Sequence, residues 1–401
     1  MSIDANRLCG IGRRGGTRPL RLHALTGTRF LAALAVFLFH VSLARLSFSP
    51  YRDGTAGLLQ WVLDKAGWVG VSYFFVLSGF VLTWGARPGM TARQFWRRRA
   101  ARLYPSHLVT AAAALLVFAW ATTGWRELVP NLLLVQVWIP RFTTFFSVNI
   151  PSWSLSCELF FYACFPLLHR WVRRIDPARL WTWVAALAAA VVCLPALALA
   201  VLPDGPAMPN GFPVSVWQYW FVYLLPPVRA LEFVLGILLA RALQTGQRGI
   251  TLRPLTAFAL TLGGYAVAMS VPFLYGLTAA TVIPLVLLLH SVAGDELAGR
   301  RSWLASRPMV WLGELSFSFY LVHVPVLILL RGLVDHRTYA PLPATGMLLL
   351  TFAASLGAAW VLNRWVERPL FRLLAGRGPR SGLRAPAIPA QRKAPSEVKA
   401  G

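Results

Sequence analysis

The chain has 401 residues, of which 57% are hydrophobic and only 13% are charged, and it contains 17 tryptophans. A water-soluble domain of this length would carry more charge, so the composition excludes a soluble globular protein and predicts an all-α, multi-pass membrane protein. The net charge of +25 comes from basic residues that gather between apolar runs, which indicates membrane topology and not nucleic-acid binding. The cysteines show neither paired nor metal-ligand spacing, so we expect no disulfide framework and no metal site.

Apolar runs recur along the chain at about twenty residues, the length that an α-helix needs to cross a bilayer. Residues 1–21 are rich in glycine and arginine, and residues 371–401 are rich in proline, arginine and alanine. We therefore expect a disordered basic tail on each side of a membrane-embedded domain at 22–370. The ten predicted spans are 24–44, 66–85, 105–123, 152–170, 179–201, 228–243, 253–269, 273–291, 308–330 and 341–363.

The loops between these spans support the count. Lysine and arginine are abundant in alternate segments, beginning with the N-terminal one, and sparse in the others. By the positive-inside rule, this pattern predicts ten crossings with both termini in the cytoplasm. Two weaker apolar pieces, Val129–Ile139 and Val214–Leu225, are each followed by proline, and we interpret them as re-entrant or interfacial segments.

The first span, Leu22–Leu43, carries Arg29 and His40. Their spacing of eleven residues places the two side chains on nearly the same helix face, about 16 Å apart along the axis. Such residues are costly in a spanning helix, so we predict that both face the protein interior and work there. The structural alternative is that Arg29 extends to the near interface and His40 only bonds a neighbouring helix.

The cytoplasmic loop after the second span, RQFWRRRAARLYPSHL, contains a cluster of arginines. Arg99 and Arg102 are three residues apart and would share a face of a short helix. Planar guanidinium groups suit phosphates, so Arg98, Arg99 and Arg102 are candidates for an anion site that holds the diphosphate end of a nucleotide. Positive-inside topology is the alternative explanation for part of the cluster.

Glu158 lies about two turns into the fourth span, in PSWSLSCELFFYACFP, and follows Ser154 at a spacing of four. A carboxylate at this depth is costly unless it is paired. By depth it falls in the same outer half as His40, and a carboxylate beside a histidine would fix its tautomer for general-base catalysis. A structural pair with Arg229, or a water pocket, is the alternative.

Other polar residues in the spans have simpler explanations. Arg229 and Glu232 are three residues apart in PPVRALEFVLG, and we expect them to neutralise each other. His323 in GELSFSFYLVHVPV is a single span histidine for which core hydrogen bonding is the first interpretation. Glu367 in VERPL is expected to cap or pair at the last cytoplasmic interface, and Gly79 with two nearby serines to allow close helix packing.

Seven motifs in order resemble the bacterial acyltransferase-3 family of integral-membrane O-acyltransferases. They are the Arg-x10-His of the first span, GWVGVSYFFVLSGFVLTW, RRAARLYP, PSWSLSCELFFY, VRALEFVLG, LGELSFSFYLVH and VERPL. The resemblance covers about residues 20–370 and departs at Cys157, where the family usually has valine or another small apolar residue. It implies that His40 is the essential histidine and Arg29 its matching arginine. It also implies an acyl-CoA-binding pair at Arg99 and Arg102, and a Ser-x-x-x-Glu pair at Ser154 and Glu158.

The resemblance implies an acyl-CoA-dependent O-acyltransferase in the bacterial inner membrane, with acyl-CoA, and acetyl-CoA first, as a co-substrate and no permanently bound cofactor. We expect His40, oriented by Glu158, to take the proton of the acceptor hydroxyl, with Arg29 positioning the donor or stabilising negative charge. An acyl-histidine relay is a variant of this mechanism. The expected acceptor is a secondary metabolite such as a macrolide or its sugar. The alternatives are a cell-surface polysaccharide or lipopolysaccharide and, in another class, a transporter or flippase. The sequence does not indicate an oligomeric state.

Overall fold

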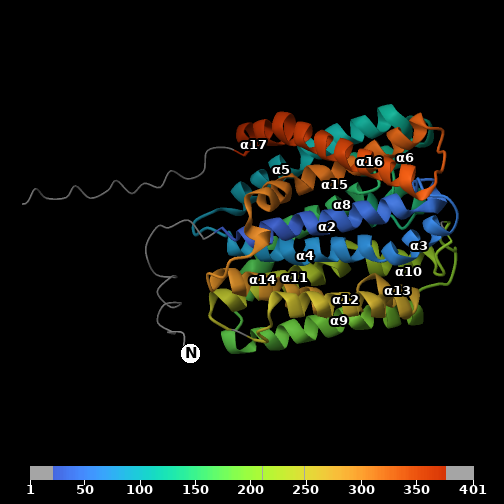
Figure 1. Ribbon diagram of the computed structural model, residues 1–401. Helices are drawn as coiled ribbons and strands as arrows, with labels where there is room; N and C mark the ends of the chain where they lie inside the picture. Colours follow the sequence, from blue (N-terminus) through green and yellow to red (C-terminus); the bar gives the residue numbers. More distant parts are fainter. Residues whose placement is uncertain (1–20, 210, 248, 376–401) are drawn as a thin grey trace, which may run out of the picture.

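The computed structural model describes residues 21–209, 211–247 and 249–375. These residues form helices packed side by side, and no strand occurs among them, so the prediction of an all-α fold is confirmed (Figure 1). The two predicted tails, 1–21 and 371–401, lie outside the described residues except for Arg21 and residues 371–375.

Helices occupy all ten predicted spans. The longer helices are α2 (His23–Ser42), α3 (Asp53–Leu63), α4 (Ala66–Trp84), α5 (Ala92–Ala114), α8 (Ser152–Val172), α9 (Leu180–Val201), α11 (Pro226–Gln244), α12 (Pro254–Ser270), α14 (Val282–Leu297), α15 (Arg307–Leu333) and α16 (Pro341–Leu362). The short ones are α6 (Trp125–Leu132), α7 (Phe142–Phe145), α10 (Val216–Tyr219), α13 (Phe273–Leu277) and α17 (Arg368–Leu374). Single 3₁₀ or π turns are η1 (Ala44–Leu46), η2 (Leu115–Ala119), η3 (Trp120–Thr122), η4 (Gln136–Trp138), η5 (Pro177–Arg179), η6 (Trp220–Leu224), η7 (Trp303–Ala305) and η8 (Asn363–Glu367).

Eight helical segments of the described chain are long and apolar enough to cross a membrane. This confirms a multi-pass membrane protein, while the count of ten stays a prediction. The two predicted spans outside the eight are α8, which carries Glu158 among several serines, and α12, which has only 17 residues. The piece Val214–Leu225 forms α10 and η6, which lead directly into α11, and Val129–Ile139 forms parts of α6 and η4.

The centre of the bundle is the contact between α4 and α11, the most extensive between any two helices. A Cβ atom at Gly79 would overlap the carbonyl oxygen of Phe233, and one at Gly236 would overlap that of Val76. The two backbones approach this closely only because both positions are glycine, so the predicted close packing at Gly79 is confirmed.

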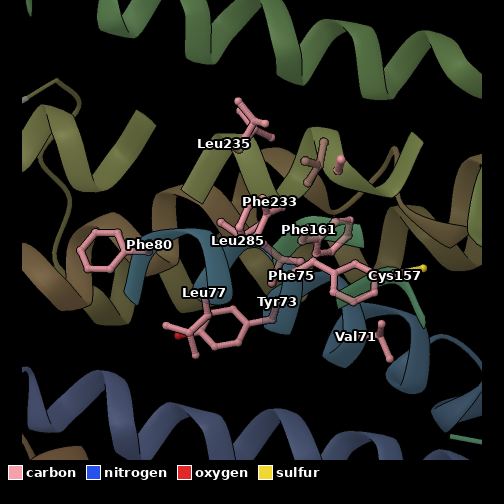
Figure 2. Packing of buried hydrophobic residues seen from close by; sticks show 14 of the residues in the cluster. Val71, Tyr73, Phe75, Leu77, Phe80, Cys157, Phe161, Phe233, Leu235 and Leu285 are labelled. Atoms are coloured by element: carbon pink, nitrogen blue, oxygen red, sulfur yellow. The ribbon is translucent and has the colours of Figure 1, made fainter. Parts of the chain in front are cut away.

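Aromatic rings fill the space where α8 meets this pair of helices. Figure 2 shows Phe75 of α4, Phe161 of α8 and Phe233 of α11 together in this cluster. The ring of Phe161 lies 5.0 Å from that of Phe75 and 4.9 Å from that of Phe233, measured between centroids. Edge-to-face and stacked contacts of this kind fix α8 against the centre of the bundle.

The helix with Arg29 and His40, α2, lies inside the bundle, packed against α15 on one side and α4 on the other (Figure 1). Helix α2 begins, and α17 ends, at the same end of the bundle, the left of the view in Figure 1. We call this the basic end, because Arg21, Arg102 and Arg372 lie there. The opposite end, where His40 lies near the end of α2, is called the histidine end.

Candidate functional site

A cavity of about 540 Å³ opens at the basic end, between α2, α4, α5, α15, η8 and α17. Its charged side chains are mostly arginines, which suits an anionic ligand. Arg29 is the residue farthest along α2 that lines it. The ionisable residues of the lining are Arg21, His23, Arg29, Arg102, Glu314, Glu367, Arg368 and Arg372.

Arg102 of α5 reaches this cavity and is held there by Glu367. Arg102 Nη1 lies 2.9 Å from Glu367 Oε1, and the arginine side chain is 36% exposed whereas the glutamate is 2% exposed. The other carboxylate oxygen accepts hydrogen bonds from Ser318 Oγ at 2.7 Å and from Asn363 Nδ2 at 3.0 Å. The predicted pairing of Glu367 is therefore confirmed, and the carboxylate fixes one side of a guanidinium whose other side faces the cavity.

Arg99 and Arg102 line two different cavities, although their spacing keeps them on nearly the same side of α5. Three residues correspond to about 300° on a helix, which leaves the two side chains about 60° apart. Arg99 lines a second cavity of about 310 Å³ between α5 and α8, where its guanidinium carbon lies 5.9 Å from the ring centre of Tyr162. Arg98 packs over Phe371 of α17 at 5.9 Å and is not part of the first cavity's lining.

Glu158 lies near arginine side chains and not beside His40. Its carboxylate accepts a hydrogen bond from Tyr162 Oη at 2.9 Å and lies within electrostatic range of Arg29, Arg99 and Arg102. Three guanidinium groups from two helices thus attract this buried carboxylate, although no ion pair within 4 Å among the described residues includes it. In the described part of the chain no hydrogen bond joins Glu158 to His40, which corrects the pairing expected from their depth.

His40 instead contacts His323, although the two are 283 residues apart. His40 Nδ1 lies 3.2 Å from His323 Nε2 and 2.9 Å from the carbonyl oxygen of Val36. His323 Nδ1 lies 3.2 Å from the carbonyl oxygen of Phe319. Both rings are buried. Sequence analysis missed this pair. The available signal was depth: α2 and α15 both begin at the basic end, and His40 lies 17 residues after His23 whereas His323 lies 16 residues after Arg307.

Ser154 connects the histidine pair to α8 through Tyr320, a residue that sequence analysis did not select. Ser154 Oγ and Tyr320 Oη lie 2.8 Å apart, and Ser154 also donates to the carbonyl oxygen of Pro151. The rings of Tyr320 and His323 are 5.9 Å apart between centroids. The only sequence signal for Tyr320 was its position three residues before His323, which places the two near one another on a helix.

Arg229 and Glu232 form a separate buried ion pair. Arg229 Nη2 lies 2.9 Å from Glu232 Oε2, with both side chains 2% exposed, and 3.1 Å from Ser72 Oγ. The guanidinium lies between the rings of Phe75 and Tyr223, 5.0 and 4.9 Å from their centres. The predicted mutual neutralisation is confirmed, and the pair joins α11 to α4.

Comparison with known proteins matches this chain to acyltransferases. The family described as an acyltransferase domain matches residues 22–364. The chain is 41% identical to the acyltransferase MdmB of Streptomyces mycarofaciens over 90% of this chain and 95% of that protein. It is 24% identical to the peptidoglycan O-acetyltransferase OatA of Listeria monocytogenes, over 86% of this chain and 55% of that protein. It is 23% identical to the O-acetyltransferase OatA of Staphylococcus aureus, over 88% of this chain and 57% of that protein.

The chain thus spans about half the length of these two O-acetyltransferases and nearly the whole of MdmB. No solved structure matches significantly.

Proposed function

Because this chain belongs to the acyltransferase domain family and is an integral-membrane O-acyltransferase, we propose that it takes its acyl group from acyl-CoA. The family favours the enzyme prediction over the transporter alternative. The observation that carries the proposal is the arginine-lined cavity, since it reaches Arg29 on the same helix that carries His40.

The cavity suits the phosphate-bearing part of acyl-CoA. A coenzyme with several phosphates needs several cations, and guanidinium groups bind phosphate through paired hydrogen bonds. Arg102, fixed by Glu367, is preorganised for such a contact because it loses little further freedom on binding. Arg99, expected beside it, lies against Tyr162 and near Glu158, so its proposed role is to balance that carboxylate.

The acyl group must then travel along α2 from Arg29 to His40. The two residues are about 16 Å apart along the helix axis, so the thin pantetheine arm of the donor would cover this distance while its phosphates stay at the basic end. Arg29 lines the cavity and lies within electrostatic range of Glu158, Glu367 and Tyr162. Its proposed role is to hold the donor in this path and to stabilise negative charge that develops on it.

The proposed chemistry at the histidine end is general-base catalysis. His40 Nε2 takes the proton of the acceptor hydroxyl while the hydroxyl oxygen forms a bond to the carbonyl carbon of the thioester. The bond between that carbon and the CoA sulfur breaks, and the thiolate receives the proton back from His40. Ester and free CoA leave, and the imidazole returns to its starting state.

We propose a hydroxyl-bearing secondary metabolite, such as a macrolide or its sugar, as the acceptor. The support is the identity of 41% to the Streptomyces acyltransferase, compared with 24% and 23% to the two O-acetyltransferases. A cell-surface polysaccharide or lipopolysaccharide is the alternative. The excess of basic residues at the ends and in alternate loops supports the proposal that the cavity opens on the cytoplasmic side of a bacterial inner membrane.

The test is acyl transfer by purified protein in lipid nanodiscs, with acetyl-CoA as donor and a panel of macrolides with free sugar hydroxyls as acceptors. Mass spectrometry would detect the added acetyl group, and a thiol reagent would measure the released CoA. His40→Gln should lower transfer by about 10²–10⁴-fold, the range for loss of a general base. His169→Gln, on α8 and stacked on Phe165, is the control and should keep full activity. A folded His40→Gln protein with undiminished transfer would end the proposal.

A further inference from the structure

The hydrogen-bond partners of the His40–His323 pair determine where its protons lie. Nδ1 of each ring faces a main-chain carbonyl oxygen one helical turn earlier, that of Val36 for His40 and that of Phe319 for His323. A carbonyl oxygen only accepts hydrogen bonds, so each Nδ1 must carry a hydrogen.

A neutral imidazole with a hydrogen on Nδ1 has a lone pair on Nε2. His323 Nε2 is therefore an acceptor, and the group facing it at 3.2 Å is Nδ1–H of His40. That hydrogen is shared between the carbonyl oxygen of Val36 and His323. Only a hydrogen bond donated by Nδ1–H of His40 to Nε2 of His323 is consistent with all three contacts. It leaves the lone pair of His40 on Nε2, the atom that has to act as the base.

Aromatic side chains hold both rings in this orientation. The ring of Phe319 stacks on His323 with an interplanar angle of 18°, and Phe37 approaches it edge-on at 6.3 Å between centroids. Phe39 lies edge-on to His40 at 5.2 Å. Among the described residues, the hydrogen bonds of the two rings go only to main-chain oxygens and to each other, so no carboxylate supports His40 directly.

We propose that His323 is the positioning residue of His40, the part that sequence analysis gave to Glu158. It accepts the Nδ1 hydrogen, which keeps the base on Nε2. It also stabilises the imidazolium that forms when Nε2 takes the acceptor's proton, because the hydrogen bond from Nδ1 then becomes charge-assisted. A neutral imidazole thus does what an aspartate does in a serine–histidine–aspartate triad. The inference rests on the proposed function, in which His40 is the base.

Two substitutions at His323 separate this role from a packing role. In His323→Gln the side-chain amide oxygen can reach the place of Nε2 and accept from His40, whereas His323→Leu fills similar space without an acceptor. His323→Leu should lower kcat about ten- to a hundred-fold, the range for one charge-assisted hydrogen bond, with the KM for acetyl-CoA unchanged. His323→Gln should recover most of the wild-type kcat. His290→Leu, which removes another buried histidine on α14, is the control and should keep its kcat.

The proton positions can be measured without any turnover. In ¹⁵N-histidine-labelled wild-type protein in bilayers, neutral His40 should show a protonated Nδ1 and an unprotonated Nε2, with its signals identified by their loss in His40→Gln. A proton on Nε2 of neutral His40 would overturn the inference, as would equal kcat values for the Leu and Gln variants at His323. If the Leu variant does not fold, the wild-type spectrum alone decides.

The two proposals can fail separately. Full transfer by His40→Gln would remove the general base whatever the spectrum shows. Loss of transfer in His40→Gln together with full kcat in His323→Leu would leave the base in place and refute only the role of His323.

Discussion

Arg102 offers the sharpest test of donor binding, because the same side chain has a structural partner and a face on the cavity. We expect Arg102→Gln to raise the KM for acetyl-CoA. A hydrogen bond to a charged group contributes about 1.5–3 kcal/mol, and each 1.4 kcal/mol is about tenfold in affinity. The expected rise in KM is therefore about ten- to a hundred-fold, with a smaller effect on kcat.

The same substitution also affects stability, which has to be separated from binding. Glu367 is 2% exposed, and without Arg102 its carboxylate keeps only Ser318 and Asn363 as donors. Breaking a buried pair costs about 3–5 kcal/mol, but the guanidinium is 36% exposed, so we expect a loss of about 1–3 kcal/mol, as for one unsatisfied buried group. The double variant Arg102→Gln/Glu367→Gln removes the unpaired charge and should regain stability without regaining donor affinity.

The assay compares two donors on the same protein in nanodiscs. Acetyl-CoA carries the phosphates, whereas S-acetyl-N-acetylcysteamine has the same thioester without them. Arg102→Gln should raise the KM for acetyl-CoA only, and Arg93→Gln, exposed on the same helix and outside the cavity, should change neither. An equal rise for both donors, or an unchanged KM for acetyl-CoA in folded protein, would refute the phosphate role.

Two further predictions concern the centre of the bundle. Gly79→Leu should abolish folded protein in detergent size-exclusion chromatography, because the new side chain would overlap the carbonyl oxygen of Phe233. Gly346→Leu, with open space around its Cβ position, is the control and should behave as wild type. A monodisperse Gly79→Leu protein would contradict the packing argument. Glu232→Gln should lower stability by about 3–5 kcal/mol because it leaves Arg229 charged and buried, and the double variant Arg229→Met/Glu232→Leu should recover most of that loss in thermal unfolding; no recovery would mean that the pair does more than neutralise itself.

The spans could be predicted from sequence because the bilayer sets a length, and a run of about twenty apolar residues is recognisable without knowing its neighbours. Helices α3, α6 and α7 have 11, 8 and 4 residues and carry no such signal. Asn131 of α6, for example, is buried and donates hydrogen bonds to Ser147 and Ser152, which are 16 and 21 residues away in sequence. Such contacts depend on tertiary structure and are invisible to periodicity.

Side-chain pairs, too, could be predicted only where the local sequence determines them. The pair of Arg229 with Glu232 was predictable because the helix itself brings positions three apart together. The pair of His40 with His323 was not, because topology gives the depth of a residue in the membrane but not the direction in which its helix turns it. Glu158 was assigned to His40 on depth alone, and the structure shows that α15 supplies the neighbour instead.

The position of Glu158 follows from charge once the helices are placed. It lies six residues into α8, about 9 Å from the start of that helix at the histidine end, and so between the depth of His40 and that of Arg29. A carboxylate there is attracted more by guanidinium groups than by a neutral imidazole, and it lies near Arg29, Arg99 and Arg102. The charged groups of the site therefore gather towards the basic end, and the histidine end keeps two imidazoles whose hydrogen bonds go to each other and to main-chain oxygens. That separation suits a donor whose phosphates are charged and whose thioester is neutral, because only the neutral part has to reach His40.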